Sequence, residues 1–104
     1  LGDVPVDRIA SAMVPMDDAL VTVALDIVDR PYCDAECPDA LYAHFLRSFA
    51  MSSGITLHAI IERGIDEHHV VEATFKALGT ALRKAIVPRE NVLSTKDTVR
   101  FGSG

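Results

Sequence analysis

The residues best suited to chemistry lie between positions 64 and 76, in the run G-I-D-E-H-H-V-V-E-A-T-F-K. On a helix with 100° per residue and His68 as the origin, Glu72 lies at about 40°, Lys76 at about 80° and His69 at about 100°. Imidazole and carboxylate groups suit Mn, Fe, Zn or Ni rather than Ca or Mg. Neighbouring imidazoles diverge by about 100°, so one ion would not easily bind both, and Glu72 lies between them. The pattern predicts ligands for two ions, or for one ion at each subunit contact.

Other interpretations of the histidines are weaker. A solvated helix start that happens to be rich in histidine is one alternative, but three of the four histidines, including His58 on a neighbouring predicted strand, fall in the proposed set. A metalloprotease motif fails because Ala73 stands where an inverted H-x-x-E-H needs its second histidine, and H-E-x-x-H is absent. His44 lies opposite the apolar stripe of its predicted helix and is expected to be an exposed surface histidine.

Two cysteines, Cys33 and Cys37, are spaced C-D-A-E-C, one residue wider than a redox pair and without the second pair of a zinc ribbon. We expect two reduced thiols without a special role.

A phosphate clamp is a further possibility at Ser94, Thr95 and Lys96, together with Arg8 and Arg30. Guanidinium, ammonium and hydroxyl groups match phosphate oxygens. Scattered basic residues and an S-T-K tripeptide are common, however, so the pattern alone favours ordinary surface roles.

The elements that must position these groups follow from periodicity. The expected order is a strand over 7–14 closed by Pro15, a strand over Ala19–Val28, a loop over 29–38, a helix from Asp39 to about Ser52 ended by Gly54, a strand over Ile55–Arg63, and a helix capped by Asp66. The segment from Pro88 onward lacks periodicity, apart from one possible short strand.

Apolar faces accompany each element. The first helix carries a stripe of Tyr42, Phe45, Leu46, Phe49 and Ala50, and the last carries Val70, Val71, Phe75, Leu78, Ala81, Leu82 and Ala85. In the strand over Ile55–Arg63, His58 points away from the apolar face. The fold class is therefore α+β: a two-layer domain with a sheet of about four strands and both helices on one face. The other sheet face is partly apolar and uncovered, which suggests self-association.

Composition limits the function classes. The 104 residues suffice for one domain, which is expected to span 1–104 with 97–104 as a flexible tail. A net charge of −5 gives no reason to expect nucleic acid or an anionic membrane as partner. No apolar run approaches the length of a membrane span, and no signal peptide is visible. We expect a soluble, cytoplasmic protein.

Several segments together resemble the C-terminal half of the imidazoleglycerol-phosphate dehydratase family, a lyase of histidine biosynthesis. The matching pieces are R-I-A-S-A-M-V-P-M-D-D-A-L (8–20), D-R-P-Y-C (29–33), H-F-L-R-S-F-A (44–50), T-L-H (56–58), G-I-D-E-H-H-V-V-E-A-T-F-K-A (64–77) and L-S-T-K (93–96). They run in the family's order across most of the chain.

The resemblance implies a fold, a cofactor and a reaction. The family consists of two similar halves of the ribosomal protein S5 domain 2 type, packed sheet to sheet and assembled into a cubic particle. Two manganese ions at each shared site would bind the substrate imidazole while water is removed from imidazole glycerol phosphate to give imidazole acetol phosphate. The resemblance assigns roles as follows: metal ligands His58, His68, His69 and Glu72; catalytic residues Asp18 and Lys76; phosphate-binding residues Arg8, Arg30, Ser94 and Lys96.

Departures from the family pattern are equally informative. The family's first half is missing from this sequence, Asp18 replaces a glutamate, and the loop between Tyr32 and His44 is shorter. We therefore expect a half-enzyme that pairs with itself in an isologous contact, so that two copies replace two halves. The alternatives are a catalytically inactive, metal-organised homo-oligomer, and a half that needs a separately encoded first half as partner.

Overall fold

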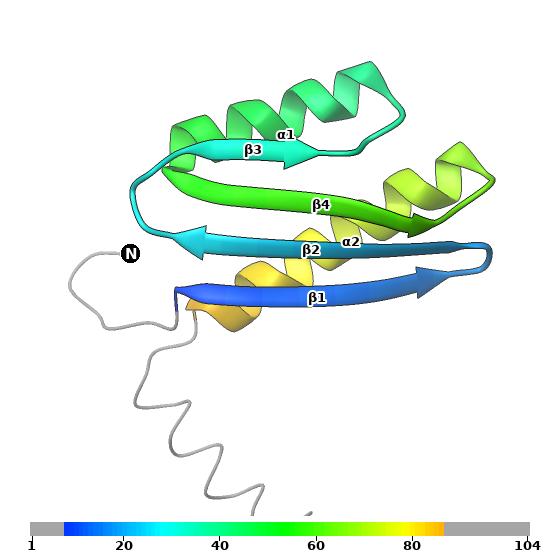
Figure 1. Ribbon diagram of the computed structural model, residues 1–104, viewed down its shortest axis with the longest axis horizontal. Helices are drawn as coiled ribbons and strands as arrows, with labels where there is room; N and C mark the ends of the chain where they lie inside the picture. The colour runs from blue at the N-terminus through cyan, green and yellow to red at the C-terminus, as the bar shows by residue number, and fades with distance from the viewer. Residues whose placement is uncertain (1–7, 87–104) are drawn as a thin grey trace, which may run out of the picture.

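The computed structural model describes residues 8–86, which form a four-stranded sheet covered on one face by two helices (Figure 1). The elements are β1 (Ile9–Met16), β2 (Ala19–Ile27), β3 (Tyr32–Ala35), α1 (Ala40–Ser53), β4 (Ile55–Arg63) and α2 (Glu67–Ile86). The predicted α+β half-domain with two helices on one face is confirmed. The predicted tail over 97–104 lies outside the described residues.

The sheet has the order β1-β2-β4-β3, with β1, β2 and β4 antiparallel and β3 parallel to β4. Helix α2 packs on β1 and β2, whereas α1 packs on β3 and β4. Both helices begin at the end of the sheet that holds the β1–β2 turn (Figure 1). The starts of the two helices and this turn therefore meet at one end of the molecule.

Alternation along the strands builds the core between sheet and helices. Alternate residues are buried over 19–25 in β2 and over 55–59 in β4, and Ile27 and Ile61 continue these faces half-buried. This confirms the predicted alternation, and small residues of α2 allow the helix to approach the sheet closely. The buried apolar residues of the two central strands and α2 are Ala19, Val21, Val23, Leu25, Ile55, Leu57, Ala59, Val70, Ala73, Ala77, Leu78, Ala81 and Ala85. Cys33 and Cys37 are free, half-buried thiols against this core, and desolvation raises the pKa of Cys33.

Two strand predictions need correction. Residues 32–35 belong to the segment 29–38, which was expected to be a loop because of its two prolines and its acidic residues, but they form β3, the fourth strand of the sheet. Cys33 and Ala35 face the core, while the acidic and aromatic residues of β3 face outward, so the segment alternates over only four residues. Pro15 does not close β1, which continues to Met16; an edge strand tolerates proline because its outer N–H positions need no partner.

Helix α1 lies where it was predicted, but Asp39, expected as its first residue, is its N-cap. Asp39 Oδ1 accepts from the N–H groups of Leu41 at 2.9 Å and Tyr42 at 3.3 Å, and Gly54 ends α1 with φ of 68°. The α1 stripe is only partly buried, however: Leu46 and Ala50 are in the core, but Tyr42 and Phe45 are exposed. None of the helices in residues 8–86 is long and apolar enough to cross a bilayer.

Candidate metal centre at the start of helix α2

Asp66 fixes the first turn of α2, on which both histidines of the pair lie. Its Oδ1 accepts from the N–H groups of His68 at 2.8 Å and His69 at 3.3 Å, which confirms the predicted cap. The imidazoles then diverge, with ring centroids 6.4 Å apart. The His68 side chain is 82% exposed, whereas the His69 side chain is 31% exposed. The two histidines therefore present different surroundings to an ion.

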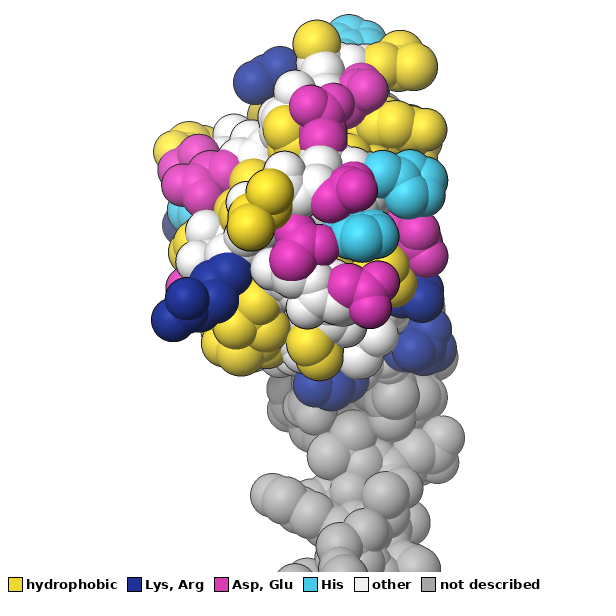
Figure 2. Space-filling model, turned by 90° about the vertical axis from the view of Figure 1, so that its right-hand side faces the viewer, with side chains coloured by type: hydrophobic (Ala, Val, Ile, Leu, Met, Phe, Trp, Pro, Cys, Tyr) yellow, Lys and Arg dark blue, Asp and Glu magenta, His cyan; other side chains and the backbone are white. Residues whose placement is uncertain are grey.

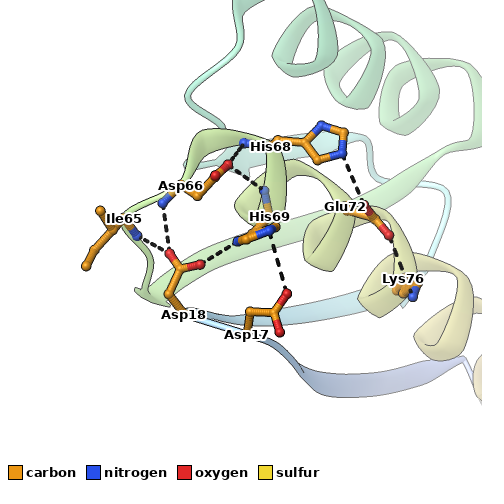
Figure 3. Close-up of polar contacts among 8 residues, drawn as sticks. All are labelled: Asp17, Asp18, Ile65, Asp66, His68, His69, Glu72 and Lys76. Atoms are coloured by element: carbon orange, nitrogen blue, oxygen red, sulfur yellow. Dashed lines mark hydrogen bonds and ion pairs between the residues drawn. The ribbon is translucent and has the colours of Figure 1, made fainter.

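His69 is held by the turn between β1 and β2 (Figure 3). Its Nδ1 lies 2.5 Å from Asp18 Oδ1, and its Nε2 lies 3.6 Å from Asp17 Oδ2. Hydrogen bonds from the Asp66 N–H, the His69 ring and the Ile65 N–H hold the pKa of Asp18 well below its usual range. The Asp18 carboxylate raises the pKa of His69 in return, against the opposing effect of desolvation. Because Asp18 is ionised and can only accept, His69 Nδ1 must donate.

His68, Glu72 and Lys76 form a second string along the outer face of α2. His68 Nε2 lies 3.4 Å from Glu72 Oε1, and Glu72 Oε2 lies 3.8 Å from Lys76 Nζ. All three side chains are exposed, so an approaching ion or substrate could reach them. These three residues lie along one side of α2, as the helical wheel predicted.

An open cleft borders this string. It is lined by Asp39, Tyr42, Glu67, His68, Val71, Glu72 and Phe75. Tyr42 and Phe75 meet edge to face with centroids 5.5 Å apart, and they also border a neighbouring apolar groove that His44 lines. His44 is exposed, as expected. Figure 2 shows imidazoles and carboxylates gathered at this end of the molecule.

His58 lies elsewhere. It belongs to the β4 residues that alternate away from the core, and its ring is 5.4 Å from that of Tyr32 on β3. The helices cover the opposite face of the sheet (Figure 1). The structure therefore does not bring His58 together with His68 and His69 within one chain, although three histidines, including His44, lie in the helical layer.

Two of the predicted phosphate residues, Arg8 and Arg30, are also distant from the histidine pair. Arg8 precedes β1 and pairs with Asp26 at the far end of β2, with Nε and Oδ1 3.2 Å apart. Arg30 follows β2 at that same end, where its carbonyl accepts from Thr56. The β1–β2 turn beside His69 is at the other end of these strands. Ser94 and Lys96 lie outside the described residues.

Sequence reasoning missed the part played by Asp17 and by the aromatic pair. Pro15–Leu20 and Met16–Ala19 are paired positions, so Asp17 and Asp18 alone form the turn. Two residues between alternating strands are a hairpin signal that the sequence already contains. The cleft beside Tyr42 had no such signal, because it depends on how two helices pack.

Within residues 8–86, no three His, Cys, Asp or Glu side chains come close enough to hold an ion. The donor types available nevertheless suit a transition metal such as manganese, and they point outward at one end of the sheet. The residues fit a metal as part of a coordination sphere, which other ligands must complete.

Fold and site define an α+β two-layer half-domain with a histidine–carboxylate cluster at one end. The family model for imidazoleglycerol-phosphate dehydratase matches residues 2–82. The chain therefore belongs to the imidazoleglycerol-phosphate dehydratase family.

Relatives and solved structures agree on this. The dehydratase of Clostridium botulinum (strain Hall) is 44% identical over 90% of this chain and 55% of its own length, and that of Methanothermobacter thermautotrophicus is 46% identical over 86% and 51%. The crystal structure of the Staphylococcus aureus dehydratase has a TM-score of 0.74 at 30% identity, covering 81% of this chain and 55% of that one. The Pyrococcus furiosus dehydratase, solved in complex with (S)-C348, has a TM-score of 0.71 at 35% identity, covering 85% and 56%. The chain spans about half the length of these relatives.

Proposed function

We propose that this chain acts as a manganese-dependent dehydratase, converting imidazole glycerol phosphate to imidazole acetol phosphate, and that it works as a self-pairing half-enzyme. Family membership supports the reaction class. The observation that carries the proposal is the start of α2, where His69 is fixed by Asp18 and His68 lies beside Glu72. These imidazole and carboxylate donors form an incomplete coordination sphere, which is what a site shared between chains requires.

The distance between the predicted phosphate-binding arginines and the histidine pair supports an active site that is shared between chains. Arg8 and Arg30 lie at one end of the sheet, and His68 and His69 lie at the other. Strand β1 has eight residues, which corresponds to roughly 26 Å at about 3.3 Å per residue. A small phosphorylated substrate cannot span that length within one chain. The basic residues of one copy would therefore bind the phosphate of a substrate whose imidazole lies at the metal ligands of another copy.

The uncovered sheet face offers a surface for self-pairing. Four large apolar residues are exposed on it: Ile9 at 67%, Met13 at 58%, Tyr32 at 51% and Ile60 at 46%. They alternate with the core residues of their strands, so they all face away from the helices. Burying such a face removes apolar area from water, which favours a second copy of the same sheet.

Individual residues would have distinct tasks in this reaction. Divalent ions bound at the shared site would supply Lewis-acid chemistry to the substrate imidazole. Lys76, one helical turn beyond Glu72, would contact the substrate beside the metal group. Arg8, Arg30, Ser94 and Lys96 would hold the phosphate and orient the glycerol tail. His58 would contribute a metal ligand from the open sheet face. His44 lies on α1 in the helical layer and is not one of the assigned ligands.

A metal-organised homo-oligomer without turnover is the second candidate, and a specific observation favours it. Two residues assigned to the substrate are already engaged within the chain: Arg8 with Asp26, and Asp18 with His69 and two backbone N–H groups. A half that needs a separate first-half chain is the third candidate. Its partner would present the missing ligands to the same cluster.

Native mass and manganese content, measured on one sample that is then assayed for dehydration, test the proposal. We expect an oligomer with bound manganese and product formation. Retained manganese without product would favour the inactive assembly, and a stable monomer in manganese would exclude self-pairing. His69→Ala is expected to lower both metal content and oligomer size, and unchanged values for both would contradict shared ligation.

A further inference from the structure

We propose that Asp18 is a positioning residue, which fixes the tautomer and orientation of His69 and does not itself act on the substrate. The inference rests on the proposed function, in which His69 binds an ion. It concerns the hydrogen-bond network that joins the β1–β2 turn to the first turn of α2 (Figure 3).

Both oxygens of the Asp18 carboxylate are occupied by donors from the α2 start. Oδ2 accepts from the N–H of Ile65 at 2.6 Å and from the N–H of Asp66 at 2.8 Å. Oδ1 accepts from His69 Nδ1 at 2.5 Å. Three donors surround one side chain that is itself only 28% exposed. The carboxylate is therefore oriented toward the protein, and not toward a ligand.

The turn that carries Asp18 leaves it little freedom. Met16 pairs with Ala19, so the turn contains only Asp17 and Asp18. Asp17 adopts φ of 51°, in the left-handed region that aspartate tolerates better than most residues other than glycine. A two-residue turn between two paired strands holds its side chains in a fixed direction, so Asp18 can act as a rigid acceptor for the ring.

This contact determines which nitrogen of His69 is available. A hydrogen on Nδ1 leaves the lone pair on Nε2, and a metal binds only an unprotonated nitrogen. Nε2 lies on the side of Asp17, whose side chain is 75% exposed. Within residues 8–86, His68 has no equivalent support from another element, because its ion-pair partner there is Glu72 on the same helix. His69 is thus the pre-oriented ligand of the pair, and Asp18 is what orients it.

Asp18→Asn in the full chain tests this assignment. The amide oxygen can still accept from the backbone N–H groups, but the amide nitrogen must face His69 Nδ1 and donate to it. We expect the hydrogen of the neutral ring to move to Nε2, as read from long-range nitrogen–proton NMR of metal-free protein labelled in histidine. Affinity for Mn²⁺ should fall by about 10- to 100-fold, the usual effect of removing an outer-shell partner. Asp66→Asn is the control for the loss of a neighbouring carboxylate charge: asparagine caps the helix equally well and does not touch the ring, so the tautomer of His69 should stay unchanged.

Three results would overturn the inference. The first is a wild-type His69 whose neutral ring carries its hydrogen on Nε2. The second is an Asp18→Asn protein that loses Mn²⁺ affinity without a change of tautomer, since a purely structural role would do that. The third result can be obtained even if the variant does not fold: Zn²⁺, added to the wild-type protein as a diamagnetic probe, shifts the NMR signal of His69 Nδ1 and not that of His69 Nε2. A wild-type chain that binds neither ion would instead refute the proposed function, while the tautomer measurement in metal-free protein would still decide the role of Asp18.

Discussion

Gly64→Ala is expected to destabilise the protein, whereas Gly79→Ala, in the helix that follows Gly64, is expected to stabilise it. A Cβ at position 64 would lie 2.3 Å from Val70 Cγ2, while a Cβ at position 79 would meet only Arg83 Nη1 at 3.9 Å. Neither glycine has a positive φ, since that conformation is confined to Gly54 among the described glycines. The two substitutions therefore add the same methyl group to a crowded and to an open position.

The magnitude follows from the overlap with Val70. Carbon atoms pack at about 3.5–4.0 Å, so the new methyl group would be more than 1 Å too close. Val70 is 4% exposed and β-branched, so it cannot rotate away cheaply. Overpacking of this kind costs about 1–3 kcal/mol, against a gain of about 0.4–1 kcal/mol from restricting the unfolded chain. We expect a net loss of about 1–2 kcal/mol for Gly64→Ala and a gain of about 0.5–1 kcal/mol for Gly79→Ala.

Urea unfolding at one fixed protein concentration measures both changes. Each 1 kcal/mol should also shift the melting temperature by roughly 4–8 °C. Val70→Ala removes the clashing Cγ2, so the cost of Gly64→Ala should disappear in the double variant. Because Val70 follows His69 directly, Gly64→Ala should also weaken Mn²⁺ binding, and Gly79→Ala should not. A Gly64→Ala protein as stable as the wild type, or a cost that persists without Val70 Cγ2, would refute the reasoning.

Three further predictions concern pH, capping and metal ligation. The pKa of Asp18 is lower in the folded protein than its ordinary value of 3.8, so Asp18 stabilises the fold above that pH and loses this effect as pH falls through the folded pKa. The pKa of His69 is raised above its ordinary value of 6.5, so His69 stabilises the fold below pH 6.5 and loses this effect as pH rises through the raised pKa. The melting temperature should therefore fall on the alkaline side of pH 6.5, less so in Asp18→Asn, and an equal fall in both proteins would contradict the link. Asp39→Ala should cost about 1 kcal/mol in urea unfolding through loss of the α1 cap, and no change would mean that the cap is dispensable. His58→Ala should lower the manganese content of the protein, because His58 is one of the assigned metal ligands. If His44→Ala lowers the manganese content and His58→Ala does not, the ligand is His44 on α1 and not His58 on β4.

Much of the fold could be predicted because long periodic segments dominate it. The alternation of β2 and β4, the helix end at Gly54 and the cap at Asp66 are local signals, and each marks the element that it predicts. Strand β3 could not be recognised in the same way. It has four residues between two prolines, and its pairing with β4 is parallel and non-local.

The site was predictable in part for the same reason. His68, Glu72 and Lys76 lie on one helix, so a helical wheel sufficed to group them. The support of His69 by Asp18 joins residues 51 positions apart, and it depends on the turn meeting the start of α2. The position of His58 on the uncovered face depends on the fold as well, because a strand alone does not say which of its faces the helices cover.

Pairing through the open sheet face would not by itself complete the cluster at the start of α2. That face lies on the opposite side of the sheet from the helices (Figure 1), whereas His68, Glu72 and Lys76 are exposed side chains of α2 (Figure 3). An isologous sheet contact would bury Met13, Tyr32 and Ile60 and would approach His58, but it would leave His68 facing solvent. In the proposed shared site, the ligands missing at His68 would then come through a second contact, made at the end of the sheet where both helices begin. Two different contacts on one chain generate assemblies larger than a dimer, so the proposed sharing of the metal site between copies predicts a high-order oligomer.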